Sequence, residues 1–306
     1  MPELPEVQTT VNGLNETIIG LYITDIWSSY NSSYFKGSDN IKDLEYFKYF
    51  KKEVLGKKIV KATRRAKNIL IHLNNGRTIL IHMKMTGHIM YGKYNFNPKN
   101  KKFPWEPVEP ESLKDPYNRH IRLIFTLSNK KYLALCDSRR FAKVTLIADY
   151  NKTEHLKDIG PEPLDKSFTF EKFIRQLNVK PNREIKRVIT DQEIIAGIGN
   201  IYADESLWRA SIHPSEKVVN IKSSKLKDLY EAIKKNLSKG IDLGGDSTSD
   251  YRNIHGERGH FHETHNVYRR KGAKCPRPGC GGTITRIVLG TRGTHFCNKH
   301  QVLSKS

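Results

Sequence analysis

The first seven residues of the chain place a proline between glutamates and the N-terminus, in the order Met1-Pro2-Glu3-Leu4-Pro5-Glu6-Val7. If Met1 is removed, Pro2 becomes an N-terminal secondary amine. An α-amino group has a pKa of about 7.7 to 8, so part of it is neutral and nucleophilic at physiological pH. Its attack on an electrophilic carbon would give an iminium, which is a Schiff base. The same residues could also simply begin a helix, because proline suits the first turn and glutamates suit its positive end.

A second group of residues that can do chemistry lies near the C-terminus. Cys275 and Cys280 are separated by four residues, Cys297 follows after sixteen more, and His300 completes a Cys-x-x-His knuckle. Three thiolates and one imidazole can surround Zn²⁺ as a tetrahedron, and four protein ligands leave no open position, so the predicted zinc site is structural. His295 is the competing fourth ligand, but the knuckle spacing favours His300.

The composition indicates a polyanionic partner. The 306 residues include 53 Lys+Arg and 32 Asp+Glu, which gives a net charge of +21 with neutral histidines. Nucleic acid is the leading partner, because neutralising phosphates releases condensed counterions. No apolar run reaches membrane-spanning length and the N-terminus lacks the features of a signal peptide, so we expect an intracellular protein that does not enter membranes. The remaining cysteine, Cys136, stands in a strand pattern and is expected in the core.

The first half of the chain predicts one helix followed by strands. Residues 5–19 carry apolar side chains at helical spacing and are followed by Gly20. Apolar and alternating runs predict strands at residues 69–73, 78–83, 121–125, 131–135 and 144–147. Residues 21–149 should therefore form a β-sandwich or barrel. Residues 94–116 are polar and rich in proline, and they predict a long surface loop.

The second half is predicted to be helical up to its cysteine-rich tail. The change from strand to helix patterns falls near residues 158–164. Apolar spacing predicts helices at residues 170–177, 185–189, 201–210 and 226–237, the last of which should end at Gly240.

Seven segments of the chain, in order, resemble the motifs of bacterial formamidopyrimidine-DNA glycosylases. They are residues 1–7, 64–67, 82–87, 137–141, 160–164, 197–205 and 292–297. The resemblance runs nearly end to end and implies an α+β chain with an N-terminal helix plus a two-layer β-sandwich, then a C-terminal helix-two-turn-helix domain with a zinc finger. The implied regions are a catalytic β-sandwich domain (1–150), a helix-two-turn-helix DNA-binding domain (151–240), a lesion-capping loop (241–265) and a zinc finger (266–306).

The resemblance also assigns catalytic roles. Enzymes of this family flip an oxidised purine out of duplex DNA, cleave its glycosidic bond and then cut the strand. By resemblance, Pro2 would attack C1′ of the damaged nucleotide. The resulting iminium acidifies the C2′ proton, and β and δ eliminations then expel both phosphates. Glu3 would transfer protons at the sugar, and Lys67 would contact a phosphate near the lesion and assist catalysis. Glu6 is assigned a structural role, as a hydrogen-bonding group that holds the N-terminal helix. Without the resemblance, Lys67 would be interpreted as a solvated basic residue.

The same resemblance implies a set of DNA-binding residues, which are His82, Met85, Arg139, Phe141, Asn200, Tyr268 and Arg292. Met85, Arg139 and Phe141 would fill the space that the extruded base leaves, whereas Asn200, Tyr268 and Arg292 would contact phosphates. Taken alone, Met85 and Phe141 would be interpreted as core residues and Asn200 as a helix cap.

Residues 244–251, followed by Gly256 and Gly259, resemble the mobile loop that closes over the extruded base, although a linker between helix and finger is the simpler alternative. The chain departs from the family pattern in its zinc ligands, where His300 replaces the usual cysteine and the gap between Cys275 and Cys280 is longer. It also has Ala142 where glycine normally follows the aromatic wedge residue.

We therefore expect a bifunctional DNA glycosylase and AP lyase of base excision repair that removes oxidised purines such as 8-oxoguanine and formamidopyrimidines. It should hold one structural Zn²⁺, use no redox or nucleotide cofactor, and act as a cytoplasmic monomer, associated with the nucleoid if the source is bacterial. Its expected partner is double-stranded DNA that contains oxidised bases or abasic sites. One alternative is an endonuclease VIII-like enzyme for oxidised pyrimidines, against which Leu4, Phe141 and the lesion-loop match argue. The other is a catalytically silent protein that binds damaged DNA through the same basic face.

Overall fold

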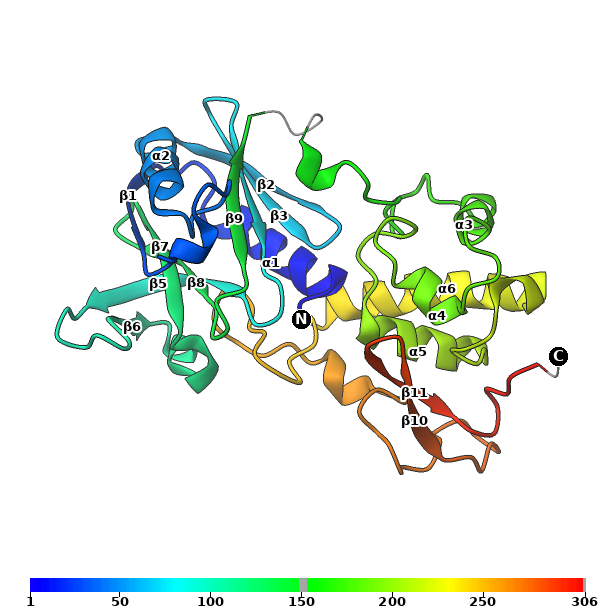
Figure 1. Cartoon of the computed structure of the whole chain (residues 1–306). Helices are drawn as coiled ribbons and strands as arrows, with labels where there is room; N and C mark the ends of the chain where they lie inside the picture. The colour runs from blue at the N-terminus through cyan, green and yellow to red at the C-terminus, as the bar shows by residue number, and fades with distance from the viewer. Residues whose placement is uncertain (149–152, 305–306) are drawn as a thin grey trace. The chain divides into compact units, whose positions relative to one another are not determined.

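The computed structural model describes residues 1–148 and 153–304 of the chain (Figure 1). The predicted domain boundary between residues 150 and 151 falls in the short gap and so lies outside the described residues. Within the two described ranges, no helix combines the length and the apolar character that a membrane crossing requires.

The chain divides into two compact units. The N-terminal unit comprises residues 1–157 and 243–260, and the C-terminal unit comprises residues 158–242 and 261–306. Residues 243–260 therefore belong to the N-terminal unit, although they follow the helices of the C-terminal unit in the sequence.

The described part of the N-terminal unit consists of two antiparallel sheets, two α-helices and several short 3₁₀ helices. Its helices and strands are α1 (Leu4–Thr17), β1 (Ile23–Ser28), α2 (Leu44–Val54), β2 (Ile59–Arg65), β3 (Asn68–Leu73), β4 (Thr78–His82), β5 (His88–Phe96), β6 (Trp105–Glu109), β7 (Ile121–Leu127), β8 (Tyr132–Cys136) and β9 (Lys143–Ile147). One sheet has the order β1-β7-β8-β5-β6 and the other the order β2-β3-β4-β9. Apolar side chains of both sheets and of α1 share one buried core. The predicted α+β fold with an N-terminal helix and a two-layer sandwich is confirmed.

Helix α1 begins with the residues that could do chemistry. It starts with a capping box, in which the side chain of Glu3 accepts a backbone N–H from Glu6 and the side chain of Glu6 accepts one from Glu3. Along its buried face, Val7, Val11 and Leu14 pack into the core, and each buried aliphatic side chain contributes roughly 1.5–3 kcal/mol of transfer free energy. The start of the chain is therefore held firmly against the sandwich.

All five predicted strands are present, with ends that differ by one or two residues from the predicted ones. Helix α2 was not predicted from the sequence. Of its apolar side chains only Phe50 and Val54 are buried, and lysines and glutamates occupy much of the remainder. Phe47, Phe50 and Val54 do recur at helical spacing, so the sequence carried a signal for this helix that the prediction missed.

The prediction of a long surface loop at residues 94–116 is wrong. Strand β5 continues to Phe96, β6 pairs with it in an antiparallel manner, and two short 3₁₀ helices, Glu111–Lys114 and Pro116–Asn118, follow. The ring of Trp105 lies 5.0 Å from that of Phe96. Proline is tolerated here because β6 is an edge strand, where a missing N–H breaks no central ladder. The polar and proline-rich composition concealed an edge hairpin.

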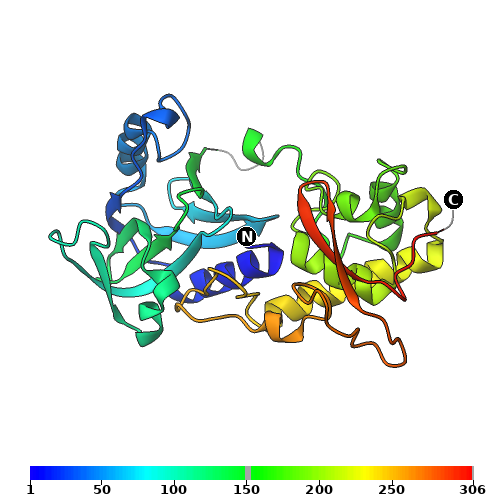
Figure 2. The same ribbon diagram turned by 60° about the horizontal axis from the view of Figure 1, so that its bottom comes forward.

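The segment after β6 holds residues 252–256 against the rest of the N-terminal unit. Arg252 is 1% exposed and donates two hydrogen bonds to the carboxylate of Asp115, at 3.0 and 3.1 Å. The hydroxyl of Ser112 donates to the carbonyl of His255, at 2.6 Å. Figure 2 shows the segment that contains these residues, in yellow to orange, beside helix α1. The segment is packed along its length and is more than a linker.

The C-terminal unit consists of helices and a β-hairpin. Its elements are α3 (Phe170–Leu177), α4 (Ile185–Ile189), α5 (Asn200–Ala210), α6 (Ser223–Asp242), β10 (Ile284–Leu289) and β11 (Arg292–Cys297). All four predicted helices are present, but α6 does not end at Gly240. A Cβ atom at Gly240 would lie 2.5 Å from the hydroxyl oxygen of Tyr202 on α5. Gly240 therefore allows two helices to approach closely and does not terminate one.

Candidate functional site

The N-terminal residues Pro2, Glu3 and Glu6 are buried together at the start of α1. The two carboxylate oxygens of Glu6 accept backbone N–H groups from different segments, Oε2 from Glu3 at 2.7 Å and Oε1 from Asp246 at 2.8 Å. Gly245 has a φ of +89°, and a Cβ atom there would lie 3.0 Å from Cγ of Glu6. Glu6 thus ties residues 244–251 to the start of α1, which supports a structural role for this carboxylate.

We expect the substitution Glu6→Gln to lower the free energy of unfolding by about 1–3 kcal/mol, because the amide NH₂ then faces one of two backbone donors that the carboxylate satisfies. Thermal and urea unfolding measure this change. The matched control is Glu16→Gln, at an exposed position of the same helix, which should unfold like the parent. Equal stability of the two variants would contradict the structural role.

Lys67 lies in the turn between β2 and β3, where Arg65 pairs with Asn68. Its 5% exposure contradicts the interpretation as a solvated lysine. Across the β3–β4 ladder, His82 is paired with Asn68. Burial, then Lys84 and Lys67, lower the pKa of His82 to about 3, so its imidazole is neutral at physiological pH. Its Nδ1 accepts the N–H of Lys84 at 3.0 Å.

A cavity of about 130 Å³ lies beside His82. Lys84 and Lys143 line it together with one acid, Asp39, whose carboxylate lies 2.7 Å from Nε2 of His155. A cavity with fixed cations and a neutral imidazole suits an anion, and phosphate is the anion that a DNA strand offers. This arrangement supports the interpretation of His82 as a DNA-facing residue, whereas Lys67 is not among the residues that line the cavity.

Met85 and Phe141 are exposed, and the interpretation of them as core residues is wrong. Met85 is 40% exposed in the β4–β5 connection and Phe141 is 46% exposed in the β8–β9 connection. The guanidinium of Arg139, which is also exposed, lies 4.5 Å from the ring centroid of Phe141. Large apolar side chains at loop tips indicate a surface that a partner covers.

A buried aspartate, whose role the sequence interpretation missed, joins these two connections. The carboxylate of Asp137 accepts the hydroxyl of Thr86 at 2.6 Å, the hydroxyl of Tyr30 at 2.9 Å and the backbone N–H of Ala142 at 2.8 Å. Thr86 follows the exposed methionine, and Ala142 follows the exposed phenylalanine. Asp137 therefore holds the two loops in one arrangement. The sequence did indicate that Asp137 matters, because it begins one of the seven segments that resemble the family motifs. Its hydrogen-bond partners, however, are known only from the fold.

In the C-terminal unit, Asn200 is the first residue of α5, and Gly199 is its N-cap. The helix-cap interpretation is therefore wrong. The side-chain amide of Asn200 donates to the carbonyl of Gly293 on β11 at 3.0 Å, beside the exposed Arg292. Tyr268 lies next to the same hairpin, with its ring 5.4 Å from that of His295. The three residues predicted to contact phosphates thus lie around one junction between α5 and the hairpin.

A buried ion pair joins the hairpin to helices α4 and α5. Nζ of Lys186 lies 2.5 Å from the carboxylate of Asp204 and donates to the hydroxyl of Thr294 at 2.7 Å. Asp204 also accepts the backbone N–H of His295 at 2.9 Å, and its carboxylate lies 3.2 Å from Nδ1 of that residue. His295 therefore faces the helices, which accounts for its absence from the cysteine cluster.

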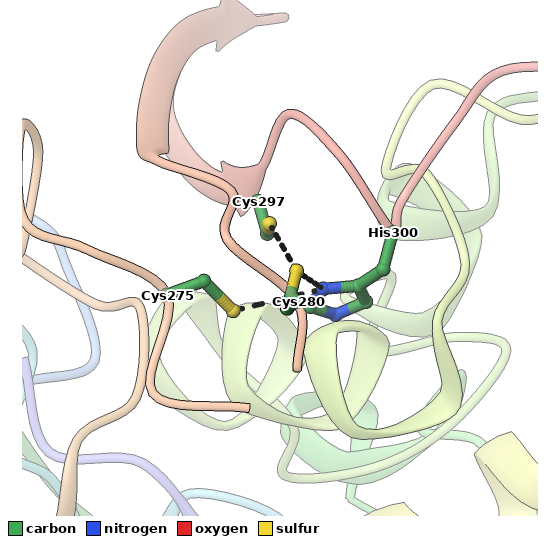
Figure 3. Close-up of side chains that lie close together, drawn as sticks. All are labelled: Cys275, Cys280, Cys297 and His300. Carbon is green, nitrogen blue, oxygen red and sulfur yellow. Dashed lines mark hydrogen bonds between the residues drawn. The ribbon is translucent and has the colours of Figure 1, made fainter. Parts of the chain in front are cut away.

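Cys275, Cys280, Cys297 and His300 converge at the end of the hairpin, as Figure 3 shows. Their ligand atoms all lie within 4.8 Å of one another. Sγ of Cys280 is 3.6 Å from Sγ of Cys297 and 3.2 Å from Nδ1 of His300. These separations are close to the edges of a tetrahedron with Zn–S bonds of about 2.3 Å and Zn–N bonds of about 2.0 Å. His300 is therefore the fourth member of the cluster.

The surroundings of the cluster suit metal binding. Nε2 of His300 lies 3.3 Å from the carbonyl of Trp208, and donation of its N–H to that oxygen leaves Nδ1 free to bind a metal. The indole N–H of Trp208 donates to Sγ of Cys275 at 3.4 Å, and the N–H of Lys299 donates to Sγ of Cys297 at 3.5 Å. The donor set therefore fits a structural Zn²⁺ that closes the finger.

Three family models match successive parts of the chain. The formamidopyrimidine-DNA glycosylase N-terminal domain matches residues 1–144, the formamidopyrimidine-DNA glycosylase H2TH domain matches residues 159–252, and the zinc finger found in FPG and IleRS matches residues 272–299. The predicted zinc cofactor is confirmed by the finger model together with the clustered ligands.

Individual relatives are similar over the whole length. A formamidopyrimidine-DNA glycosylase of Herpetosiphon aurantiacus is 32% identical over 297 residues, which cover 97% of this chain and 98% of the relative. The crystal structure of the MutM (Fpg) protein from Thermus thermophilus superimposes with a TM-score of 0.76 at 30% identity, covering 99% of this chain and 100% of that one. The wild-type Fpg of Lactococcus lactis, solved with an N7-benzyl-Fapy-dG containing DNA, gives a TM-score of 0.78 at 31% identity over 97% and 98% of the two chains. The chain belongs to the formamidopyrimidine-DNA glycosylase family.

Proposed function

We propose that this protein, a DNA glycosylase of base excision repair, removes oxidised purines with Pro2 as its nucleophile and then cuts the strand as an AP lyase. The observation that carries the proposal is the buried Pro2-Glu3 pair, which α1 and the carboxylate of Glu6 hold in place. A nucleophile and a proton-transfer group that are adjacent in the chain and fixed by a helix start are arranged for attack on a sugar carbon.

The proposed reaction begins when the neutral amine of Pro2 attacks C1′ of the damaged nucleotide. The glycosidic bond breaks, its electron pair leaves with the base, and the departing base takes up the proton that the proline nitrogen loses. Opening of the sugar ring, with O4′ protonated from Glu3, gives the iminium between the proline nitrogen and C1′. The iminium acidifies the C2′ proton, whose removal expels the 3′ phosphate, and a second elimination expels the 5′ phosphate. Water then releases Pro2 from the sugar fragment.

The other predicted residues bind the DNA in this proposal. Met85, Arg139 and Phe141 occupy the stack where the nucleotide is extruded, since all three are exposed on loops of one unit. Lys67 and His82 contact a phosphate near the lesion. In the C-terminal unit, Asn200, Tyr268 and Arg292 bind the backbone, and a Zn²⁺ held by the cysteine cluster would keep the hairpin of Arg292 rigid. We further propose that the protein acts as a monomer in the cytoplasm, at the nucleoid if its source is bacterial.

A lesion panel tests the proposal. Duplexes that contain 8-oxoguanine, a formamidopyrimidine or thymine glycol are incubated with the protein in the presence of borohydride, which reduces the iminium to a stable adduct. We expect rapid trapping on both purine lesions and weak trapping on thymine glycol. The purine preference is supported by the purine lesion in the Lactococcus lactis complex. Faster trapping on thymine glycol would favour an endonuclease VIII-like specificity, and binding with no adduct on any duplex would indicate a catalytically silent protein.

A further inference from the structure

The N-terminal unit contains a cavity of about 250 Å³. None of the residues to which we have given a catalytic, DNA-binding or metal-binding role lines it. The connection between β5 and β6 supplies Lys101, Lys102 and Phe103 to its wall, and the start of β7 supplies Arg122. Arg140, between β8 and β9, completes it. Three segments that are far apart in the sequence thus bring four cations to one cavity.

The cations of this cavity form no ion pair among the described residues, although the charge of Asp137 acts on Arg122. No aspartate or glutamate lines it, and within residues 1–148 and 153–304 none of its four lysines and arginines is within 4 Å of a carboxylate. Two lysines that flank this connection in the sequence are paired, since Lys93 lies 2.7 Å from Glu109 and Lys114 lies 2.7 Å from Glu111. Cations that gather without an acid repel one another, and a bound anion would relieve this repulsion.

The response of neighbouring groups agrees with this charge distribution. Burial, followed by the charge of Arg140, lowers the pKa of Arg122. The pKa of His120, which also lines the cavity, is lowered by burial and then by Arg122, Arg119 and Lys102. Asp137 acts in the opposite direction on Arg122, and Asp250 does so on His120, so burial and the neighbouring cations together outweigh the acids at both groups.

The wall of the cavity is organised by an aromatic ring and by hydrogen bonds. The ring of Phe103 lies 5.3 Å from the imidazole of His120. The ammonium group of Lys102 lies 5.4 Å from the centroid of the Phe103 ring. Nε of Arg122 donates to the carbonyl of Asp137 at 3.0 Å. Ser29 also lines the cavity, and its hydroxyl oxygen is buried with no hydrogen-bond partner among the described residues. A buried hydroxyl without a partner supplies a donor that a phosphate oxygen could accept.

The location of Arg140 relates the cavity to the duplex. Arg140 has a φ of +58° and stands between the exposed Arg139 and Phe141, which the proposed function places in the DNA stack. Resting on that proposed function, we propose that the cavity binds a backbone phosphate of the lesion-containing duplex, close to the nucleotides that Arg139 and Phe141 contact. The β5–β6 connection then provides a DNA contact in addition to those of the helices and the finger.

The test uses the full chain with the double substitution Lys101→Ala/Lys102→Ala. Its affinity for a duplex with a non-cleavable abasic analogue is measured between 50 mM and 1 M salt. Each phosphate contact contributes about 0.9 to the slope of log K against log salt, so we expect a slope shallower by about 1–2 and an affinity about tenfold or more lower at 50 mM. The two affinities should converge at high salt. An unchanged slope would overturn the proposal.

Two further variants separate a built site from general basicity. Lys48→Ala/Lys52→Ala on α2 removes the same charge at exposed positions, one of which is paired with Glu45, and its slope should remain within about 0.5 of the parent slope. Ser29→Ala removes the buried hydroxyl without a change in charge, and it should weaken binding about fivefold at every salt concentration, as expected for one hydrogen bond. Equal slopes for the two lysine pairs would overturn the proposal.

Borohydride trapping distinguishes this inference from the proposed function. If the parent protein forms no trapped adduct, the proposed function is contradicted. If the parent is trapped normally and the Lys101/Lys102 variant has an unchanged salt slope, only the phosphate cavity is contradicted. Inorganic phosphate provides the remaining arm. Thermal stabilisation by phosphate that requires Lys101 and Lys102, together with an unchanged DNA slope, would show a site for the free anion and would also overturn the proposal.

Discussion

Replacement of Pro2 by glycine should reduce the borohydride-trapped adduct on an 8-oxoguanine duplex by on the order of 10²-fold or more, since it removes the proposed nucleophile. Glycine still offers an amine, but a primary one, and it lacks the ring that occupies the buried position at the start of α1. The backbone at residue 2 also gains freedom, so the nitrogen is no longer held for attack. Affinity for the abasic-analogue duplex should change little, because the phosphate and stacking contacts are intact.

The matched control is Pro5→Ala, which alters a proline of the same N-terminal segment at the second position of α1 but leaves the terminal amine unchanged. It should retain trapping near the parent level. Mass spectrometry of the mature protein should show that Met1 has been removed. An active preparation that retains Met1, or a Pro2→Gly variant that is trapped as well as the parent, would contradict Pro2 as the nucleophile.

Removal of zinc should have the second largest effect. Cys297 is fully buried at the end of β11, so Cys297→Ala should abolish stoichiometric zinc and weaken duplex binding by on the order of 10²-fold. Structural Zn²⁺ contributes about 10–16 kcal/mol of apparent binding free energy in finger peptides, and a finger without metal loses its order. Arg292 and Gly293 begin the strand that Cys297 ends, so loss of the metal disorganises the contacts of Asn200. The sandwich core belongs to the other unit and should remain folded.

Elemental analysis and duplex titration measure this effect, and far-UV circular dichroism reports on the remaining fold. Cys136→Ala is the control, because Cys136 is a buried cysteine of β8 in the N-terminal unit and should leave the zinc content unchanged. His300→Ala should lose zinc, whereas His295→Ala should retain it and weaken only the attachment to Asp204. The reverse result for the two histidines would refute the ligand set, and a parent protein without stoichiometric zinc would refute the metal site.

The sequence was sufficient to predict helices, strands and ligand spacings whose pattern is contained within a few neighbouring residues. The apolar spacing of α1 and the short separation of Cys297 from His300 are properties of one segment, and both agree with the structure. The apolar runs at residues 69–73 and 78–83 predicted the neighbouring strands β3 and β4 for the same reason. The resemblance of seven short segments supplied the family, because each motif is itself local.

Long-range contacts decided the rest. The sequence could not show that Met85 and Phe141 are exposed, because an apolar residue has the same identity in a core and on a loop that a partner covers. Nor could it show that Trp105 pairs with Phe96 as an edge strand or that Gly240 packs against Tyr202, since burial and close approach depend on elements distant in the chain. Periodicity and ligand spacing are encoded within a segment. The partners of the buried carboxylate of Asp137, and the cavity that brings Arg140 to Arg122 and Lys101, exist only once separate segments have folded together.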